Sequence, residues 1–194
     1  MAAAPDRETE LNLANRLSLL RIILVPVFVL SLVYYSPEKN HLRFLSVGIF
    51  ILACATDALD GYLARRLGEQ TVLGSYIDPI ADKLLLVSGF LSLSFMGHLP
   101  AAIRIPAWVT VAVISRDLLI IIGAIIIFIT TGRLKAEPLF VGKATTVLQM
   151  ATLFLSLLAA PGGILFLFFI ATVTLTILSG VLYVQMGGRL LQTD

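Results

Sequence analysis

The chain has 194 residues, of which 58% are hydrophobic and 13% are charged, and its net charge is +2. Long apolar stretches recur along its whole length, which excludes an ordinary soluble domain and indicates an integral membrane protein. The small net charge and the lack of a basic groove with interleaved aromatic residues argue against a nucleic-acid partner. The single cysteine, Cys54, excludes a disulfide within the chain and a cysteine-based zinc site.

Apolar runs of about 20 residues predict transmembrane helices. In chain order we expect six, over residues 17–35, 44–63, 80–98, 105–131, 144–160 and 164–186. The segment 10–21 is expected to be an interfacial lead-in to the first span. We find no repeat, linker or separate soluble domain, so the sequence predicts an all-α, polytopic membrane protein with one domain over residues 1–194.

The distribution of basic residues predicts the orientation in the membrane. With six helices both termini lie on one side, and that side collects Arg7, Arg16, Arg21, Arg65, Arg66, Lys83, Arg133, Lys135, Lys143 and Arg189, against Lys39, Arg43 and Arg104 on the other. The positive-inside rule then places both termini on the cytoplasmic side of the cell membrane.

Four aspartates stand in one short frame at the predicted cytoplasmic ends of the second and third helices, namely Asp57, Asp60, Asp78 and Asp82. An aspartate near the centre of a spanning helix is disfavoured by about 2.5–3.5 kcal/mol, so four would cost roughly 10 kcal/mol. A bound cation and partial hydration at the membrane face would offset this cost.

Helical geometry predicts that these carboxylates share a site. At 100° per residue, Asp57, Asp60, Gly61 and Ala64 fall on one face of the second helix, while Gly74, Asp78 and Asp82 follow one stripe of the third. Clustered carboxylates suit magnesium, manganese or calcium, and magnesium shares its shell with substrate phosphates. The small residues would let a nucleotide or a diphosphate approach the backbone, and Arg65 could neutralise a phosphate.

The frame resembles the signature of the CDP-alcohol phosphotransferase family. It reads Asp57-Ala-Leu-Asp60-Gly61-Tyr-Leu-Ala64-Arg65, then eight residues, then Gly74-Ser-Tyr-Ile-Asp78-Pro-Ile-Ala-Asp82, and every signature position is present. More weakly, the six helices, the lead-in with Asn12, Asn15, Ser18 and Arg21, and the segment 176–180 are similar to bacterial phosphatidylglycerophosphate synthases.

The resemblance implies an enzyme of phospholipid biosynthesis that transfers phosphatidyl from CDP-diacylglycerol to an alcohol and releases CMP. It implies that Asp57, Asp60 and Asp78 bind Mg²⁺ or Mn²⁺, and that Asp82 is both a ligand and the general base. Gly61, Ala64, Arg65 and Gly74 would then bind the CDP moiety. A homodimer is also expected by similarity to the family.

Three basic residues, Arg21, Arg116 and Lys143, lie in or near apolar spans, where a cation needs an anionic partner or access to the headgroup layer. For Arg116, the sequence leaves open an ion pair with an aspartate on another helix. For Arg21 and Lys143, it leaves open a position in the headgroup layer. The resemblance favours binding of the acceptor's phosphate by all three.

Two acceptors fit the resemblance. Glycerol 3-phosphate, giving phosphatidylglycerophosphate, is the first interpretation. Arg116-Asp117 resembles the Arg-Glu pair of the synthases that use this acceptor. Those synthases usually carry a further arginine about two turns beyond the pair, but residues 118–127 here have no charge. Phosphatidylglycerol, the acceptor of CMP-forming cardiolipin synthases, is the second interpretation, and a non-catalytic site for binding or transport of divalent ions is an alternative from another class.

Overall fold

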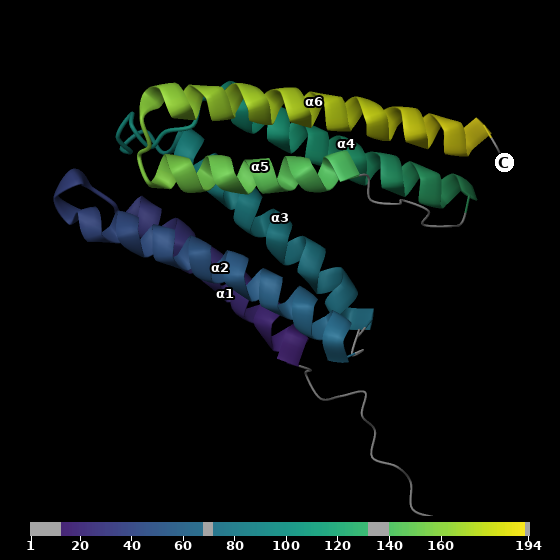
Figure 1. Cartoon of the computed structure of the whole chain (residues 1–194), viewed down its shortest axis with the longest axis horizontal. Coiled ribbons are helices and arrows are strands. Elements are labelled where there is room, and N and C mark those ends of the chain that lie inside the picture. The colour runs from purple at the N-terminus through teal and green to yellow at the C-terminus, as the bar shows by residue number, and fades with distance from the viewer. Residues whose placement is uncertain (1–12, 68–71, 132–139, 193–194) are drawn as a thin grey trace, which may run out of the picture. The chain divides into compact units, whose positions relative to one another are not determined.

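The computed structural model describes residues 13–67, 72–131 and 140–192, with side chains at 17–59, 80–130 and 140–189. Its helices in chain order are α1 (Leu13–Val33), the 3₁₀ helix η1 (Pro37–Lys39), α2 (Asn40–Leu67), α3 (Val72–Phe95), α4 (Ala107–Thr131), α5 (Phe140–Leu157) and α6 (Gly162–Gln192) (Figure 1). The described residues contain no strand, which confirms the all-α prediction for them.

Four helical segments of the described chain are long and apolar enough to cross a membrane, and they indicate a multi-pass membrane protein. They are Pro37–Leu59, Ala107–Thr130, Phe140–Leu157 and Gly162–Arg189, with Leu17–Val33 as a shorter apolar helix. Large apolar side chains cover the outside of these helices; Ile129 is 75% exposed and Leu167 is 65% exposed. Such surfaces are suited to lipid rather than to water. The prediction of six spans goes further than these four segments.

The third helix begins well before the predicted start at residue 80. The predicted start is where the apolar residues begin, but α3 starts at Val72, so it includes Gly74 and Asp78 as well as Asp82. Backbone hydrogen bonding does not stop where a helix becomes polar. Of the predicted interfacial segment, residues 13–21 belong to α1, and residues 10–12 lie outside the described chain.

The chain divides into two compact units, residues 1–88 and 89–194, so the single domain over 1–194 stays a prediction. In the first unit α1 packs against α2. Phe28 and Phe50 meet in this interface with ring centroids 6.3 Å apart, and the buried hydroxyls of Ser31 and Ser46 hydrogen bond at 2.7 Å. Extended Ser36 precedes η1, which begins at Pro37 between the two helices, where the fixed φ of proline suits a helix start.

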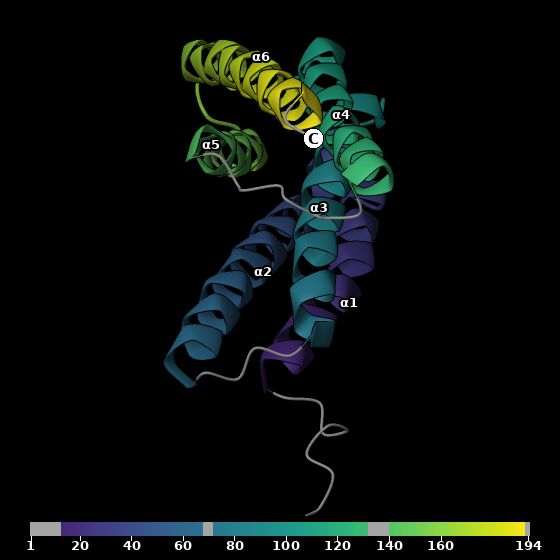
Figure 2. The same cartoon turned by 90° about the vertical axis from the view of Figure 1, so that its right-hand side faces the viewer.

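In the second unit α6 lies beside both α4 and α5 (Figure 2). Both α5 and α6 carry buried hydroxyl and amide side chains, and some of them bond across the contact of the two helices. On α5 these are Thr145, Gln149, Thr152 and Ser156, and on α6 they are Thr172, Thr176 and Ser179. The hydroxyls of Thr152 and Thr172 lie 2.7 Å apart, and Gln149 Nε2 donates to Thr176 Oγ1 at 3.4 Å. Polar contacts of this kind hold helices together where lipid removes the hydrophobic driving force.

The connection from α5 to α6 contains a backbone conformation that favours glycine. Ala159 has φ of 53°, and the amides of Ala159 and Ala160 donate to the carbonyls of Ser156 and Leu155 as α5 ends. We predict that Ala159→Gly stabilises the protein by about 1 kcal/mol, because glycine adopts positive φ without the Cβ clash. The thermal unfolding midpoint in detergent should rise, whereas Ala160→Gly should not raise it. An unchanged or lower midpoint for Ala159→Gly would contradict this.

Candidate functional site

The first unit brings Arg21 of α1, Asp57 of α2 and Asp82 of α3 together. Arg21 is completely buried, although it carries a charge. Its Nη1 lies 3.0 Å from Asp57 Oδ1, and the same nitrogen donates a hydrogen bond to Asp82 Oδ1. A buried guanidinium requires such partners, because desolvating an unpaired charge costs several kcal/mol. The two carboxylates, 25 residues apart in the chain, therefore converge on one atom.

Asp57 and Asp82 remain accessible, because their side chains are 36% and 30% exposed. The first unit thus buries the guanidinium of Arg21 and leaves the carboxylates of Asp57 and Asp82 partly exposed to solvent. Hard anionic oxygens that meet at one point are the donors that Mg²⁺ and Mn²⁺ prefer.

The other predicted ligands, Asp60 on α2 and Asp78 on α3, lie outside the described side chains, as do the predicted CDP-binding residues Gly61, Ala64, Arg65 and Gly74. Within the described part no three His, Cys, Asp or Glu side chains form a metal-binding group. The donor set of Asp57 and Asp82 fits a divalent cation, and the backbone of the full frame lies on α2 and α3 as the helical register requires.

The predicted acceptor-binding residues fall in both units. Arg21 lies with the aspartates, while Arg116 and Lys143 lie on α4 and α5 of the second unit. Lys143 is exposed, and its neighbour Gly142 is buried. A Cβ built on Gly142 would stand 3.2 Å from Arg116 Nη2, so the α5 backbone at Gly142 closely approaches Arg116.

Arg116 is only 8% exposed. It pairs with Asp117, the next residue of the same helix, at 2.9 Å, and Nη2 donates to Ser179 Oγ of α6 at 2.7 Å. The sequence leaves open an ion pair between Arg116 and an aspartate on another helix, but the observed partner, Asp117, is on α4 itself. Our sequence reasoning missed the contact with Ser179, although Ser179 belongs to the 176–180 segment that contributes to the resemblance.

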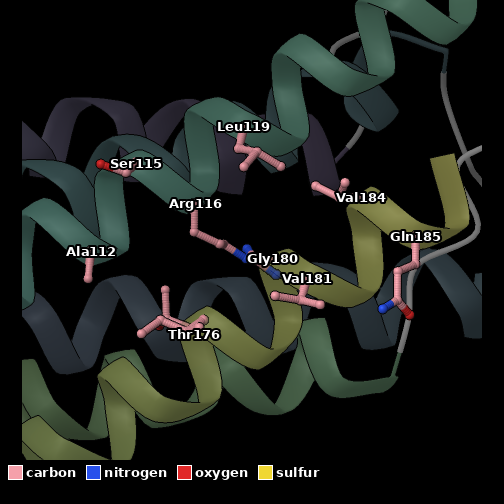
Figure 3. A pocket seen from close by; sticks show the side chains of 10 residues that line it. Ala112, Ser115, Arg116, Leu119, Thr176, Gly180, Val181, Val184 and Gln185 are labelled. Atoms are coloured by element: carbon pink, nitrogen blue, oxygen red, sulfur yellow. The ribbon is translucent and has the colours of Figure 1, made fainter. Parts of the chain in front are cut away.

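A cavity of about 430 Å³ lies between α4 and α6 beside Arg116. Its walls are mainly apolar, with Leu119, Ile177 and Val184 among them. Figure 3 shows Arg116 extending from α4 towards Gly180 and Val181 of α6. The second unit therefore places a buried cation next to a space in which a ligand could lie.

The Arg21 cluster predicts a measurable effect on stability. Arg21→Gln removes the cation shared by two carboxylates and should lower the free energy of unfolding by about 2 kcal/mol, below the usual range for a broken buried pair because both carboxylates are partly exposed. Thermal unfolding in detergent measures the loss. Arg104→Gln, at an exposed position, is the control and should unfold like the wild type. Equal midpoints for the two variants would show that the cluster adds no stability.

Comparisons with known proteins agree on one family. The family model for CDP-alcohol phosphatidyltransferase matches residues 11–181. The chain is 38% identical over 182 residues to a probable phosphatidylglycerophosphate synthase of Mycobacterium tuberculosis, covering 92% of this chain and 82% of the relative. It is 34% identical to the CDP-diacylglycerol–glycerol-3-phosphate 3-phosphatidyltransferase of Aquifex aeolicus over 80% of this chain and 77% of the relative. The enzyme of the same name from Bacillus subtilis is 34% identical over 72% of each chain.

Proposed function

Because the chain belongs to the CDP-alcohol phosphatidyltransferase family, we propose that it transfers the phosphatidyl group of CDP-diacylglycerol to glycerol 3-phosphate. The products are phosphatidylglycerophosphate and CMP, and the reaction is a step of phospholipid biosynthesis. The names of its relatives support this acceptor. The observation that carries the proposal is the meeting of Asp57 and Asp82 at Arg21, within the complete aspartate frame.

The reaction is an in-line displacement at the β-phosphorus of CDP-diacylglycerol. The acceptor hydroxyl oxygen forms a bond to this phosphorus, the bond to the oxygen bridging the two phosphorus atoms breaks, and CMP leaves with that electron pair. An alcohol is a poor nucleophile at neutral pH, so a carboxylate must accept its proton during the attack. We assign this proton to Asp82, whose side chain is partly exposed and held by Arg21.

Asp57, Asp60, Asp78 and Asp82 would hold the divalent ion, Mg²⁺ or Mn²⁺. When bound, the ion supplies positive charge to the diphosphate and makes CMP a better leaving group. Arg21 has a supporting role in this proposal, because it balances and orients two of the four carboxylates. Its predicted contact with the acceptor's phosphate stays a prediction.

The remaining predicted residues bind the two substrates. Gly61, Ala64 and Gly74 lack bulky side chains and leave room for the nucleotide, and Arg65 would neutralise a phosphate of CDP. Arg116 and Lys143 are proposed to bind the phosphate of glycerol 3-phosphate. The close approach of Gly142, the residue before Lys143, to the Arg116 guanidinium supports their joint action.

The membrane arrangement that we propose has six spans in the cytoplasmic membrane, with both termini and the aspartate frame on the cytoplasmic side. The positive-inside bias supports this orientation. CDP-diacylglycerol is a lipid, whereas glycerol 3-phosphate and magnesium are soluble, so the site has to lie where bilayer and cytoplasm meet. A homodimer remains an expectation from the family.

Cardiolipin synthesis is the second candidate, favoured by the uncharged stretch 118–127. Incubation of the purified protein with CDP-diacylglycerol and Mg²⁺ separates the candidates when CMP release is measured. We expect CMP with glycerol 3-phosphate and none with phosphatidylglycerol. CMP only with phosphatidylglycerol would favour cardiolipin synthesis, and no CMP with either acceptor would favour the ion-site alternative.

The general base has its own test. Asp82→Asn keeps a side chain of the same size but cannot accept the proton, so we expect turnover to fall by at least about 100-fold. Binding of CDP-diacylglycerol, measured by its protection against thermal unfolding, should be partly retained. Asp57→Asn serves as the comparison. It loses a metal ligand but keeps the base, so it should bind Mg²⁺ more weakly and need a higher Mg²⁺ concentration for half-maximal activity. Near-normal turnover of Asp82→Asn would remove Asp82 from the base role.

A further inference from the structure

The guanidinium of Arg116 is held by three helices. Nη1 donates to Asp117 Oδ1 of α4 at 2.9 Å, and Nη2 donates to Ser179 Oγ of α6 at 2.7 Å. The ring of Tyr183, one turn after Ser179, lies under the group, with Cζ 5.5 Å from the ring centroid. A hydrogen bond and a stacked aromatic face together fix the plane of an arginine.

The third helix contributes a glycine whose lack of a side chain is required. A Cβ on Gly142 of α5 would stand 2.8 Å from Tyr183 Oη and 3.2 Å from Arg116 Nη2. No real side chain tolerates the first distance, so alanine at this position would displace the ring, the guanidinium or both. Gly142 therefore lets the α5 backbone lie against the arginine, immediately before Lys143.

These contacts orient the guanidinium without adding a further negative charge. Ser179, Tyr183 and Gly142 are neutral, and Asp117 is the carboxylate that pairs with Arg116 within the described chain. Arg116 Nε is buried and has no hydrogen-bond partner among the described residues. Arg116 is also one of the residues that line the cavity between α4 and α6. An arginine that recognises phosphate needs a fixed plane and donors left for the ligand.

We propose that Gly142, Ser179 and Tyr183 are positioning residues that hold Arg116 in the orientation in which it binds the phosphate of glycerol 3-phosphate. This inference rests on the proposed function and extends it to three residues that do not themselves touch the substrate. The same contacts also join α4, α5 and α6, so a purely structural role is the competing interpretation. The two interpretations differ in which kinetic constant changes.

The test measures KM for both substrates, kcat and thermal unfolding of the full-length protein in detergent. Loss of one hydrogen bond to a charged group corresponds to about tenfold in binding, so Ser179→Ala should raise KM for glycerol 3-phosphate by about that factor. Gly142→Ala should raise it at least as much. KM for CDP-diacylglycerol should stay within about twofold, and Ser179→Thr, which keeps the hydroxyl, should restore most of the acceptor affinity.

Two matched controls separate positioning from packing. Thr172→Ala removes a fully buried hydroxyl of α6 that bonds to Thr152. It should lower the unfolding midpoint about as much as Ser179→Ala while leaving both KM values unchanged. Gly163→Ala adds a Cβ where nothing lies within 4 Å and should have no effect.

A double variant tests the contact itself. Tyr183→Phe removes the oxygen that lies nearest to the added Cβ, so Gly142→Ala combined with Tyr183→Phe should bind glycerol 3-phosphate better than Gly142→Ala alone. Such non-additivity is expected only of residues in contact. Simple addition of the two single effects would contradict the proposed arrangement.

Arg116→Ala shows which claim fails if the results differ. If it raises KM for glycerol 3-phosphate but Ser179→Ala and Gly142→Ala do not, the positioning role is wrong and the proposed function stands. If both substrates' KM values rise together in the Ser179 and Gly142 variants, the residues are structural and the inference is overturned. If Arg116→Ala leaves the acceptor KM unchanged, or glycerol 3-phosphate gives no CMP at all, both the acceptor site and the inference fall.

Discussion

One buried positive charge organises the first unit. Arg21 is fully removed from solvent, and a guanidinium in that position persists only with anionic partners close by. Asp57 and Asp82 provide them from two different helices. The requirement acts in both directions, because the arginine also reduces the repulsion between carboxylates that would otherwise separate. A chain with few charges can thereby keep a concentrated acidic site at the end of apolar helices.

The second unit also contains a buried arginine with bonded partners, but its partners differ from those of Arg21. Arg116 is buried as well, but only one carboxylate, from its own helix, is bonded to it in the described chain, and its other contacts are a hydroxyl, an aromatic ring and a glycine. Two paired carboxylates around Arg21 leave oxygens for a metal ion, whereas one carboxylate and neutral neighbours around Arg116 leave donors for an anion. The difference in partners thus matches the two proposed roles, metal–diphosphate binding and acceptor-phosphate binding.

The sequence predicted the helices well and the contacts between them poorly. Apolar runs located all six α-helices of the described chain, four of which contain segments long and apolar enough to cross a membrane, but they missed the start of α3 at Val72. Helical spacing and the family signature both pointed to the aspartate frame, and its two members with described side chains, Asp57 and Asp82, meet at Arg21. The two partners of Arg21, Asp57 and Asp82, could not be predicted, since helices pair through tertiary packing. Ser179 lies in the 176–180 segment of the resemblance and Tyr183 follows it at i, i+4, but neither signal identifies Arg116 as their contact. Thr145, Gln149, Thr152 and Ser156 do follow such a pattern, and their buried position could have been read from it.

Direct metal binding tests the central claim, that Asp57 and Asp82 are brought together to hold a cation with the diphosphate. Electron paramagnetic resonance of Mn²⁺ titrated into the purified protein, with and without CDP-diacylglycerol, reports binding without turnover. The account predicts that the lipid tightens Mn²⁺ binding in the wild type and that Asp57→Asn and Asp82→Asn each weaken it by about tenfold or more. Wild-type Mn²⁺ affinity in both variants, with no effect of the lipid, would contradict it.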